Sequence, residues 1–225
     1  MCQANRFVDQ HLEFFRTCLD VQEQWTGGSP RLWTTQITDG DWNHLPVENI
    51  TRQQLKELCR NSRYSNEDCI FAIMAWGGLN RRHGRRLANN VQHLTNIVTS
   101  LRNETMSATD AYTAIYQIIQ GAPIGIRPAY YTKLIFFLDP NHSCYIMDQW
   151  TAKSINLLRG TPVVRLQQGH VSNLNTAAIY NVFCQEIRYL ANLLEQDPEH
   201  IEMALFSEGR NRGRWRQYVV NNWTP

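Results

Sequence analysis

The spacing of apolar residues constrains the fold of this 225-residue chain more than any other feature, because it is helical almost throughout. An amphipathic first helix is indicated by Phe7, Leu12, Phe14, Phe15 and Leu19. Further helices are predicted over residues 51–58, 65–75, 85–102, 107–120, 128–138, 149–158, 175–194 and 198–207. No segment repeats at a fixed period. The sequence therefore predicts an all-α fold with very little sheet.

Two segments lack the helical spacing. Residues 25–49, WTGGSPRLWTTQITDGDWNHLPVEN, contain three tryptophans among glycines and prolines, so we expect a long irregular excursion that could hold a short hairpin. Loops of this length in compact domains are usually functional. Residues 159–174 read as a polar connection between helices.

Composition excludes several classes of protein. The chain is 43% hydrophobic and 19% charged, as an ordinary globular protein is. Its six cysteines are scattered without a CxxC pair, which argues against a disulfide framework, a zinc site or an iron–sulfur cluster. No apolar run approaches the ~20 residues that span a bilayer, and the start MCQANRF does not resemble a signal peptide. We therefore expect a cytoplasmic protein with reduced thiols, no metal site and no membrane contact.

Positive charge is concentrated although the net charge is only +2. The segments NRRHGRR (80–86) and GRNRGRWR (209–216) hold eight arginines. Such clusters can be solvated surface, or they can be the footprint of a polyanion. The candidates for binding a polyanion are Arg81, Arg82, Arg85, Arg212 and Arg214.

A glycine- and proline-rich turn precedes the most apolar predicted helix. The segment QGAPIGI forms a tight hairpin between helices, Pro128 suits the first turn of AYYTKLIFFL, and Asp139-Pro140 ends that helix. The amides of Gly125, Arg127 and the helix start are expected to point outward together. Such a terminus binds phosphate well, and Arg127 adds a positive charge.

The chain then returns toward Asp148. Eleven helical residues rise roughly 16 Å, whereas the nine steps from Asp139 to Asp148 span about 30 Å if extended. Asp148 can therefore lie beside the hairpin. It also stands where it would cap the helix QWTAKSINLL, whose dipole favours an ionised carboxylate. A helix cap and a catalytic acid are both open interpretations of this residue.

The order and spacing of these features resemble the helix-hairpin-helix DNA glycosylases. In that superfamily a hairpin of the form LPGxGxxTA grips the DNA backbone, and an acid some twenty residues later lies at the scissile nucleoside. Here the hairpin reads PIGIRPA, and the acid in IMDQW follows Gly125 by 23 residues. Together with AWGG at 75–78, the chain looks most like the compact branch named for 8-oxoguanine glycosylase, which includes bacterial antiphage defence proteins.

The resemblance implies a single glycosylase domain over residues 1–225, with two helical lobes around a cleft. The helix-hairpin-helix and the acid occupy residues 108–150. Two positions depart from the family pattern. Arg127 replaces the second hairpin glycine, and Ala129 stands where bifunctional relatives carry a Schiff-base lysine. Lys133, one helical turn further along, is a substitute candidate.

The function implied is that of a monofunctional DNA N-glycosylase, which flips a modified base out of double-stranded DNA and leaves an abasic site. Asp148 would be catalytic, while Gly125, Arg127, Lys133 and the basic clusters would hold phosphates. The base pocket would draw on Trp150, Trp25, Trp33 and Trp42. We expect a monomer without a cofactor, although the hairpin is a candidate site for a structural monovalent cation.

The substrate and two other classes of function remain open at this point. The defence-associated members suggest a hypermodified phage base such as glucosylated hydroxymethylcytosine, whereas the branch name suggests 8-oxoguanine repair. A non-enzymatic helix-hairpin-helix module would bind DNA with Asp148 as a cap only. A helical scaffold that binds no nucleic acid would use its arginines for solubility.

Overall fold

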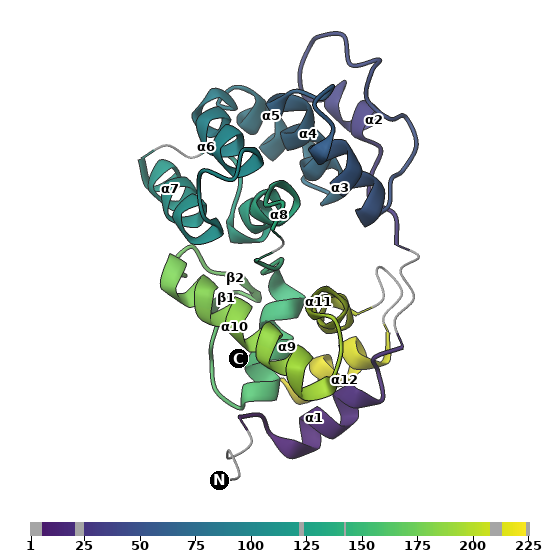
Figure 1. The fold of residues 1–225 in the computed structure, drawn as a ribbon, viewed down its shortest axis with the longest axis vertical. Helices are drawn as coiled ribbons and strands as arrows, with labels where there is room; N and C mark the ends of the chain where they lie inside the picture. The colour runs from purple at the N-terminus through teal and green to yellow at the C-terminus, as the bar shows by residue number, and fades with distance from the viewer. Residues whose placement is uncertain (1–5, 21–24, 122–123, 142, 208–212, 224–225) are drawn as a thin grey trace. The chain divides into compact units, whose positions relative to one another are not determined.

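The computed structural model describes residues 6–20, 25–121, 124–141, 143–207 and 213–223. Within these ranges the chain forms twelve α-helices and one two-stranded sheet, so the predicted all-α fold is confirmed (Figure 1). None of the described helices is long and apolar enough to cross a membrane.

The chain divides into two compact helical units. One comprises Gln24–Cys144 and contains the hairpin, so we call it the hairpin unit. The other, the aspartate unit, comprises Met1–Glu23 and Tyr145–Pro225 and contains Asp148. Two helical units agree with the two lobes that the family resemblance implied, whereas the cleft between them stays a prediction.

The hairpin unit contains a buried helix that packs against four others. Its helices are α2 (Pro30–Thr34), α3 (Arg52–Arg60), α4 (Asn66–Trp76), α5 (Arg81–Ala88), α6 (Gln92–Arg102), α7 (Ala108–Gly121) and α8 (Pro128–Leu138). Helix α8 packs against α3, α4, α6 and α7 (Figure 1). Pro128 and all residues from Tyr131 to Leu138 are buried. The apolar run after the hairpin is therefore part of the core of this unit, together with α4, in which every residue from Asp68 to Trp76 is buried.

The ends of these helices follow the local signals in the sequence. Capping boxes begin α3 at Thr51 and α4 at Ser65, since each side chain accepts a hydrogen bond from the third helical amide. Helix α8 begins at Pro128 as predicted and ends before Asp139. The Asp139 carboxylate accepts hydrogen bonds from the Asn141 and Ser143 amides, at 3.0 and 2.9 Å, and so fixes the turn after α8.

The prediction of one helix over residues 85–102 is wrong. The segment is divided between α5 and α6, and α5 begins four residues earlier than expected. The Asn80 side chain caps α5 by accepting from the His83 amide at 3.0 Å. Near the other end, the Asn90 side chain donates to the Arg86 carbonyl oxygen at 2.8 Å. Asparagine side chains that bond the backbone compete with helix continuation, which explains both boundaries.

The excursion over residues 25–49 is largely irregular but is not a hairpin. It contains the short helix α2, which Ser29 caps and which packs against α4. Thr26 forms a single antiparallel bridge with Thr51 rather than with a strand inside the excursion.

The aspartate unit is built around α9. Its elements are α1 (Asp9–Arg16), α9 (Gln149–Arg159), β1 (Leu166–Gln167), β2 (His170–Val171), α10 (Ala177–Leu194), α11 (Pro198–Phe206) and α12 (Arg214–Asn222). Helix α9 packs against α1, α10, α11, α12 and β2. Ser154 joins three of these helices, because its hydroxyl donates to Leu205 of α11 and accepts from the Trp215 indole of α12, both at 2.9 Å.

Three elements of this unit, β1, β2 and α12, were not predicted. Residues 159–174, read as a polar connection, contain the β1–β2 hairpin. Gln168 and Gly169 at its turn have φ values of 51° and 79°, as in a type I′ turn. Strands of two residues are too short to show alternation. Helix α12 overlaps the second arginine cluster and was not recognised in the sequence, because only Trp215 and Val219 of this helix are buried.

Candidate active site

Asp148 is the N-cap of α9, as predicted. Its Oδ1 accepts hydrogen bonds from the amides of Trp150 and Thr151, at 2.7 and 3.0 Å. The Asp148 amide donates to the Thr151 hydroxyl at 3.0 Å, and this hydroxyl in turn donates to the Ile146 carbonyl oxygen at 2.9 Å. The capping box thus fixes both the backbone and the side chain of Asp148.

The two oxygens of the Asp148 carboxylate have different environments. Oδ1 is held by the cap, whereas Oδ2 accepts no hydrogen bond from any residue that the structure describes. Asp148 is only 7% exposed. The residue therefore presents a rigid and largely buried carboxylate, one oxygen of which has no hydrogen-bond donor among the described residues.

Two cations and three aromatic rings surround the start of α9. The Lys153 ammonium lies 4.6 Å from the ring centre of Trp150 and 5.1 Å from that of Trp223. The Arg216 guanidinium lies 4.6 Å from the same Trp150 ring and 4.8 Å from Phe206. The Trp150 indole, predicted to contact a base, thus has two cations over it in this structure.

Burial changes the titration of both cations. It lowers the pKa of the Lys153 ammonium and of the Arg216 guanidinium, because a partly dehydrated cation is less stable than a hydrated one. The Asp148 carboxylate opposes the pKa shift in both cases, since it attracts each cation. Asp148, Lys153 and Arg216 thus form one electrostatic cluster. No pattern in the sequence singled out Lys153 or Trp223.

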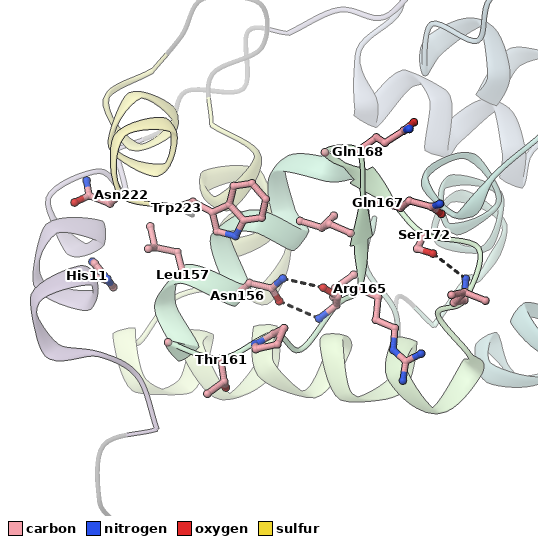
Figure 2. Close-up of a pocket in the computed structure, with 16 residues that line it drawn as sticks. His11, Asn156, Leu157, Thr161, Arg165, Gln167, Gln168, Ser172, Asn222 and Trp223 are labelled. Carbon is pink, nitrogen blue, oxygen red and sulfur yellow. Dashed lines mark hydrogen bonds between the residues drawn. The ribbon is translucent and has the colours of Figure 1, made fainter. Parts of the chain in front are cut away.

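A cavity of about 950 Å³ lies along α9 in the same unit (Figure 2). Its polar and aromatic lining includes His11, Asn156, Gln167, Gln168, Asn222 and Trp223. In Figure 2, Asn156 extends from α9 and exchanges hydrogen bonds with the backbone of Val164, at 2.8 and 2.9 Å. These bonds hold the segment before β1 as one wall of the cavity.

The cavity is connected to the start of α9 through the turn of the β-hairpin. The Gln149 amide, in the orientation that satisfies both of its polar atoms, donates to the Gly169 carbonyl oxygen and accepts from the Trp150 indole, both at 3.2 Å. Gly169 lines the cavity. The residue next to Asp148 therefore contacts the cavity wall.

In the hairpin unit, the structure brings the hairpin against the basic helix α5. Gly125 has φ of 91°, and a Cβ there would lie 2.6 Å from the His83 carbonyl oxygen. The His83 ring donates from Nδ1 to the Gly125 carbonyl oxygen at 3.0 Å. Only glycine fits both the conformation and the space. The contact joins two features that lie 42 residues apart in the sequence.

The hairpin and α5 together expose a basic surface. Arg81, Arg82, Arg85, Arg86 and Arg127 are all exposed. We call these five arginines with Gly125 the hairpin surface. Arg85 also donates to the Gln36 carbonyl oxygen at 3.2 Å, which ties the surface to the excursion.

Lys133 is placed differently from these arginines. Its side chain is buried in α8, and its ammonium donates to the Ala129 carbonyl oxygen at 3.0 Å. Gly77 of the AWGG segment makes room for it, since a Cβ there would lie 2.9 Å from Lys133 Cδ. Lys133 thus lies one helical turn from Ala129, the position at which bifunctional relatives carry the lysine. The Lys133 amine, however, is directed at the backbone of its own helix.

Comparison with known families now identifies the chain. A family model described as "Putative 8-oxoguanine DNA glycosylase OGG-like protein" matches residues 19–206. The chain belongs to this family. The match covers the whole hairpin unit and most of the aspartate unit, including Asp148. No curated protein matches the chain, and no solved structure does.

In this OGG-like chain, the predicted base-pocket tryptophans are divided between the units. Trp150 belongs to the aspartate unit. Trp25, Trp33 and Trp42 belong to the hairpin unit, where all three are half-buried. Trp25 packs edge-on against Trp76 with ring centres 4.2 Å apart, and the other two pack against Phe71 of α4. The shared base pocket stays a prediction.

The second arginine cluster of the OGG-like chain is only partly described. Arg212 lies outside the described residues. Arg214 is exposed on α12 with its guanidinium 5.7 Å from the Phe14 ring centre. Arg216 is the member of this cluster that reaches Trp150.

Nothing in the structure tests the monovalent cation expected at the hairpin of the OGG-like chain. Residues 122 and 123 lie outside the described residues, and the Gly125 carbonyl oxygen already accepts from His83. The described residues contain no group of three or more histidine, cysteine or acidic side chains that could hold a metal ion.

Replacing Arg81, Arg82, Arg85 and Arg86 of this OGG-like chain by glutamine is expected to weaken DNA binding for every sequence, because phosphate contacts carry no base information. The logarithm of the affinity should also depend less steeply on the logarithm of salt concentration, by about one unit for each lost contact. Titrations at several salt concentrations measure both effects. Arg63→Gln, an exposed change in the same unit, is the control. If the salt dependence of the affinity is unchanged in the quadruple variant, the arginines of α5 are ordinary solvated surface and do not contact phosphates.

Proposed function

We propose that the chain is a monofunctional DNA N-glycosylase that excises a modified base and leaves an abasic site, with Asp148 as the catalytic carboxylate. The observation that best supports this proposal is the asymmetry of that carboxylate. One oxygen is fixed by two amides of α9, and the other accepts no hydrogen bond from the described residues. Family membership supplies the DNA substrate class.

The chemistry requires a fixed negative charge. Cleavage of an N-glycosidic bond develops positive charge on the sugar, and a carboxylate near the anomeric carbon stabilises it and orients the attacking water. The Asp148 cap prevents the side chain from rotating away, so the charge needs no rearrangement during the reaction. The base must first leave the duplex, at a cost of a few kcal/mol. The hairpin surface would hold the backbone of the double-stranded DNA.

Water, rather than a lysine, is the proposed nucleophile. Ala129 has no amine to form an imine with the sugar. The Lys133 amine is buried and donates to the Ala129 carbonyl oxygen, so it is not presented to a ligand in this structure. We therefore expect base release without strand cleavage.

For the substrate, we propose a hypermodified phage base such as glucosylated hydroxymethylcytosine, and hence a role in antiphage defence. The support is the resemblance to defence-associated members of the branch, together with the cavity of about 950 Å³ that lies along the C-terminal part of α9 and whose lining residue Gly169 accepts a hydrogen bond from Gln149. Pockets of 300–1,000 Å³ accommodate drug-sized ligands, so this cavity offers room for more than an unmodified base. The family description favours 8-oxoguanine as the second candidate.

Base release from three DNAs tests the proposal: phage DNA with glucosylated hydroxymethylcytosine, a duplex with 8-oxoguanine, and an unmodified duplex. We expect release from the first, with strands intact until heat or alkali cleaves the abasic sites. Release from the 8-oxoguanine duplex alone would mean that 8-oxoguanine, and not the phage base, is the substrate. No release from either modified DNA would contradict the proposed glycosylase activity. A covalent adduct trapped by borohydride would contradict the monofunctional mechanism.

The defence role has its own measurement. Cells that express the chain should form fewer plaques with a phage that glucosylates its DNA than with a mutant phage lacking the modification. The Asp148→Asn variant is expected to remove the difference. Equal plaque numbers for the two phages in cells that express the wild-type chain would contradict the defence role. The proposed enzymatic activity would then be judged by the release assay alone.

A further inference from the structure

We propose that His83 is a positioning residue for DNA binding by the hairpin. Its hydrogen bond to the Gly125 carbonyl oxygen, 3.0 Å long, holds one peptide of the hairpin in the orientation in which the amide of that peptide can donate to a DNA phosphate. His83 acts through the hairpin and does not itself touch the DNA. The inference rests on the proposed function, because that function brings the DNA backbone to the hairpin surface.

Two isoleucines anchor the hairpin in the core but do not fix the residue between them. Ile124 and Ile126 are buried, with 0% and 3% of their surface exposed, whereas Gly125 is only partly buried. Gly125 has φ of 91°, and a glycine can adopt many other backbone conformations at little cost. The hydrogen bond from His83 therefore restricts a residue that has no side chain to hold it in place.

The same hydrogen bond determines where the next amide points. The peptide between Gly125 and Ile126 is trans, so its carbonyl and its N–H point in opposite directions. Because the carbonyl is directed at the His83 ring, the Ile126 amide is directed away from that ring. Neither this amide nor the amide of Arg127 donates to any residue that the structure describes. Backbone amides without an acceptor are donors for an anion such as a phosphate.

Helix α5 keeps His83 in place. The Asn80 side chain that caps this helix accepts from the His83 amide at 3.0 Å. The hairpin backbone lies directly against α5, because a Cβ on Gly125 would be 2.6 Å from the His83 carbonyl oxygen. The next residue of the helix, Gly84, meets the excursion, where a Cβ would be 2.7 Å from the Trp33 ring. Helix α5 is thus packed against both the hairpin and the excursion, which leaves it little room to move.

The hydrogen bond does not depend on the charge of the histidine. A carbonyl oxygen only accepts hydrogen bonds, so Nδ1 of His83 carries a proton whenever the bond is made. Both the neutral ring with its proton on Nδ1 and the doubly protonated ring meet this condition. A neutral His83 can therefore hold the hairpin without adding charge to the hairpin surface. This property separates His83 from the neighbouring arginines, which would contact phosphates as cations.

Two substitutions of equal shape test the hydrogen bond separately from packing. Asparagine carries an amide donor where histidine has Nδ1, whereas leucine has a methyl group there. Dissociation constants are measured for the wild-type chain, His83→Asn and His83→Leu with a duplex that contains a tetrahydrofuran analogue of an abasic site, which no glycosylase can cleave. Titrations at several salt concentrations are run at about pH 8, where an unperturbed histidine is neutral. His93→Leu, an exposed change on α6 of the same unit, is the control.

His83→Leu is expected to bind the duplex about fivefold to tenfold more weakly than the wild type, the effect of losing one hydrogen bond. His83→Asn should keep most of the wild-type affinity, and His93→Leu should bind as the wild type does. The salt dependence should be the same in all four chains, because a contact between an amide and a phosphate releases no counterion of its own. Leucine is a better helix former than asparagine, so weaker binding by His83→Leu would not come from a weaker α5.

The amide of Ile126 gives a direct readout of the positioning. Its NMR resonance should shift when the duplex is added to the wild type or to His83→Asn, because in both the amide keeps its orientation toward the phosphate. The shift should be smaller in His83→Leu, in which the peptide is released. In the wild type, the ¹⁵N spectrum of the neutral His83 ring should show its proton on Nδ1.

Equal affinities of the wild type and His83→Leu would overturn the proposal, and so would equal losses in His83→Leu and His83→Asn. A weaker salt dependence in His83→Leu would mean that His83 contacts a phosphate as a cation, which also contradicts a positioning role. The measurement needs no base release, so the two proposals can fail separately. The expected pattern in a chain that excises no base would contradict only the proposed function. Base excision by a chain whose His83→Leu variant binds as tightly as the wild type would contradict only the role of His83.

Discussion

Asp148→Asn is expected to lower the single-turnover rate of base release by at least about 10²–10³-fold, the effect of removing one electrostatic group aimed at a transition state. Asparagine caps helices about as well as aspartate. The amides of Trp150 and Thr151 therefore keep their acceptor, and thermal unfolding should change little. DNA binding should survive or become tighter, because a carboxylate near phosphates repels them.

Asp197→Asn is the matched control for this experiment. Asp197 caps α11 in the same way, by accepting from the amides of Glu199 and His200 at 2.8 and 3.2 Å. Both variants thus remove a negative charge from an aspartate cap of the aspartate unit. Only Asp148→Asn should lose base release. If it releases base at the wild-type rate, Asp148 is a helix cap only.

Trp215→Ala is expected to have the largest effect on stability, a loss of about 3–5 kcal/mol in the free energy of unfolding. The indole is only 1% exposed and meets the Phe15 ring edge-on, with ring centres 4.8 Å apart. Its Nε1 donates to the Ser154 hydroxyl at 2.9 Å. The change would leave a cavity between α1, α9 and α12.

Trp215→Phe separates packing from the hydrogen bond. Phenylalanine keeps an aromatic ring against Phe15 but removes the donor to Ser154. It should therefore cost much less than alanine, with about 1 kcal/mol for the lost hydrogen bond. Urea denaturation of the wild type and both variants measures these differences. A loss below about 1 kcal/mol for Trp215→Ala would mean that α12 contributes little to the stability of the unit.

The parts of the fold that local chemistry determines could be predicted from the sequence. The helix starts at residues 51 and 65 and the cap at Asp148 could be predicted, because a short polar side chain at each position bonds amides two or three residues away. Pro128 marked the start of α8 for a similarly local reason. Helix α12 and the β1–β2 hairpin were missed because their patterns are too short to separate from a polar segment.

The candidate site was predictable only in part, because its side chains meet through tertiary packing. Asp148 stood out by its spacing from Gly125. No spacing relates Arg216 to Trp150, since they come together only when α12 packs against α9. The same holds for the contact of His83 with Gly125, which joins the basic cluster to the hairpin. Sequence patterns found the two basic clusters but not the partners of their arginines.

Asp148 combines a cap oxygen, Oδ1, with a negative charge, and this combination limits which amino acids can occupy the position. Serine, threonine and asparagine accept hydrogen bonds at a helix start but carry no negative charge. Glutamate carries the charge, but its longer side chain is not a favoured cap. Aspartate is the one residue of the twenty that combines a favoured cap with a carboxylate. Serine, threonine or asparagine here should therefore give a folded chain without activity, and glutamate a charged chain whose α9 has lost its cap.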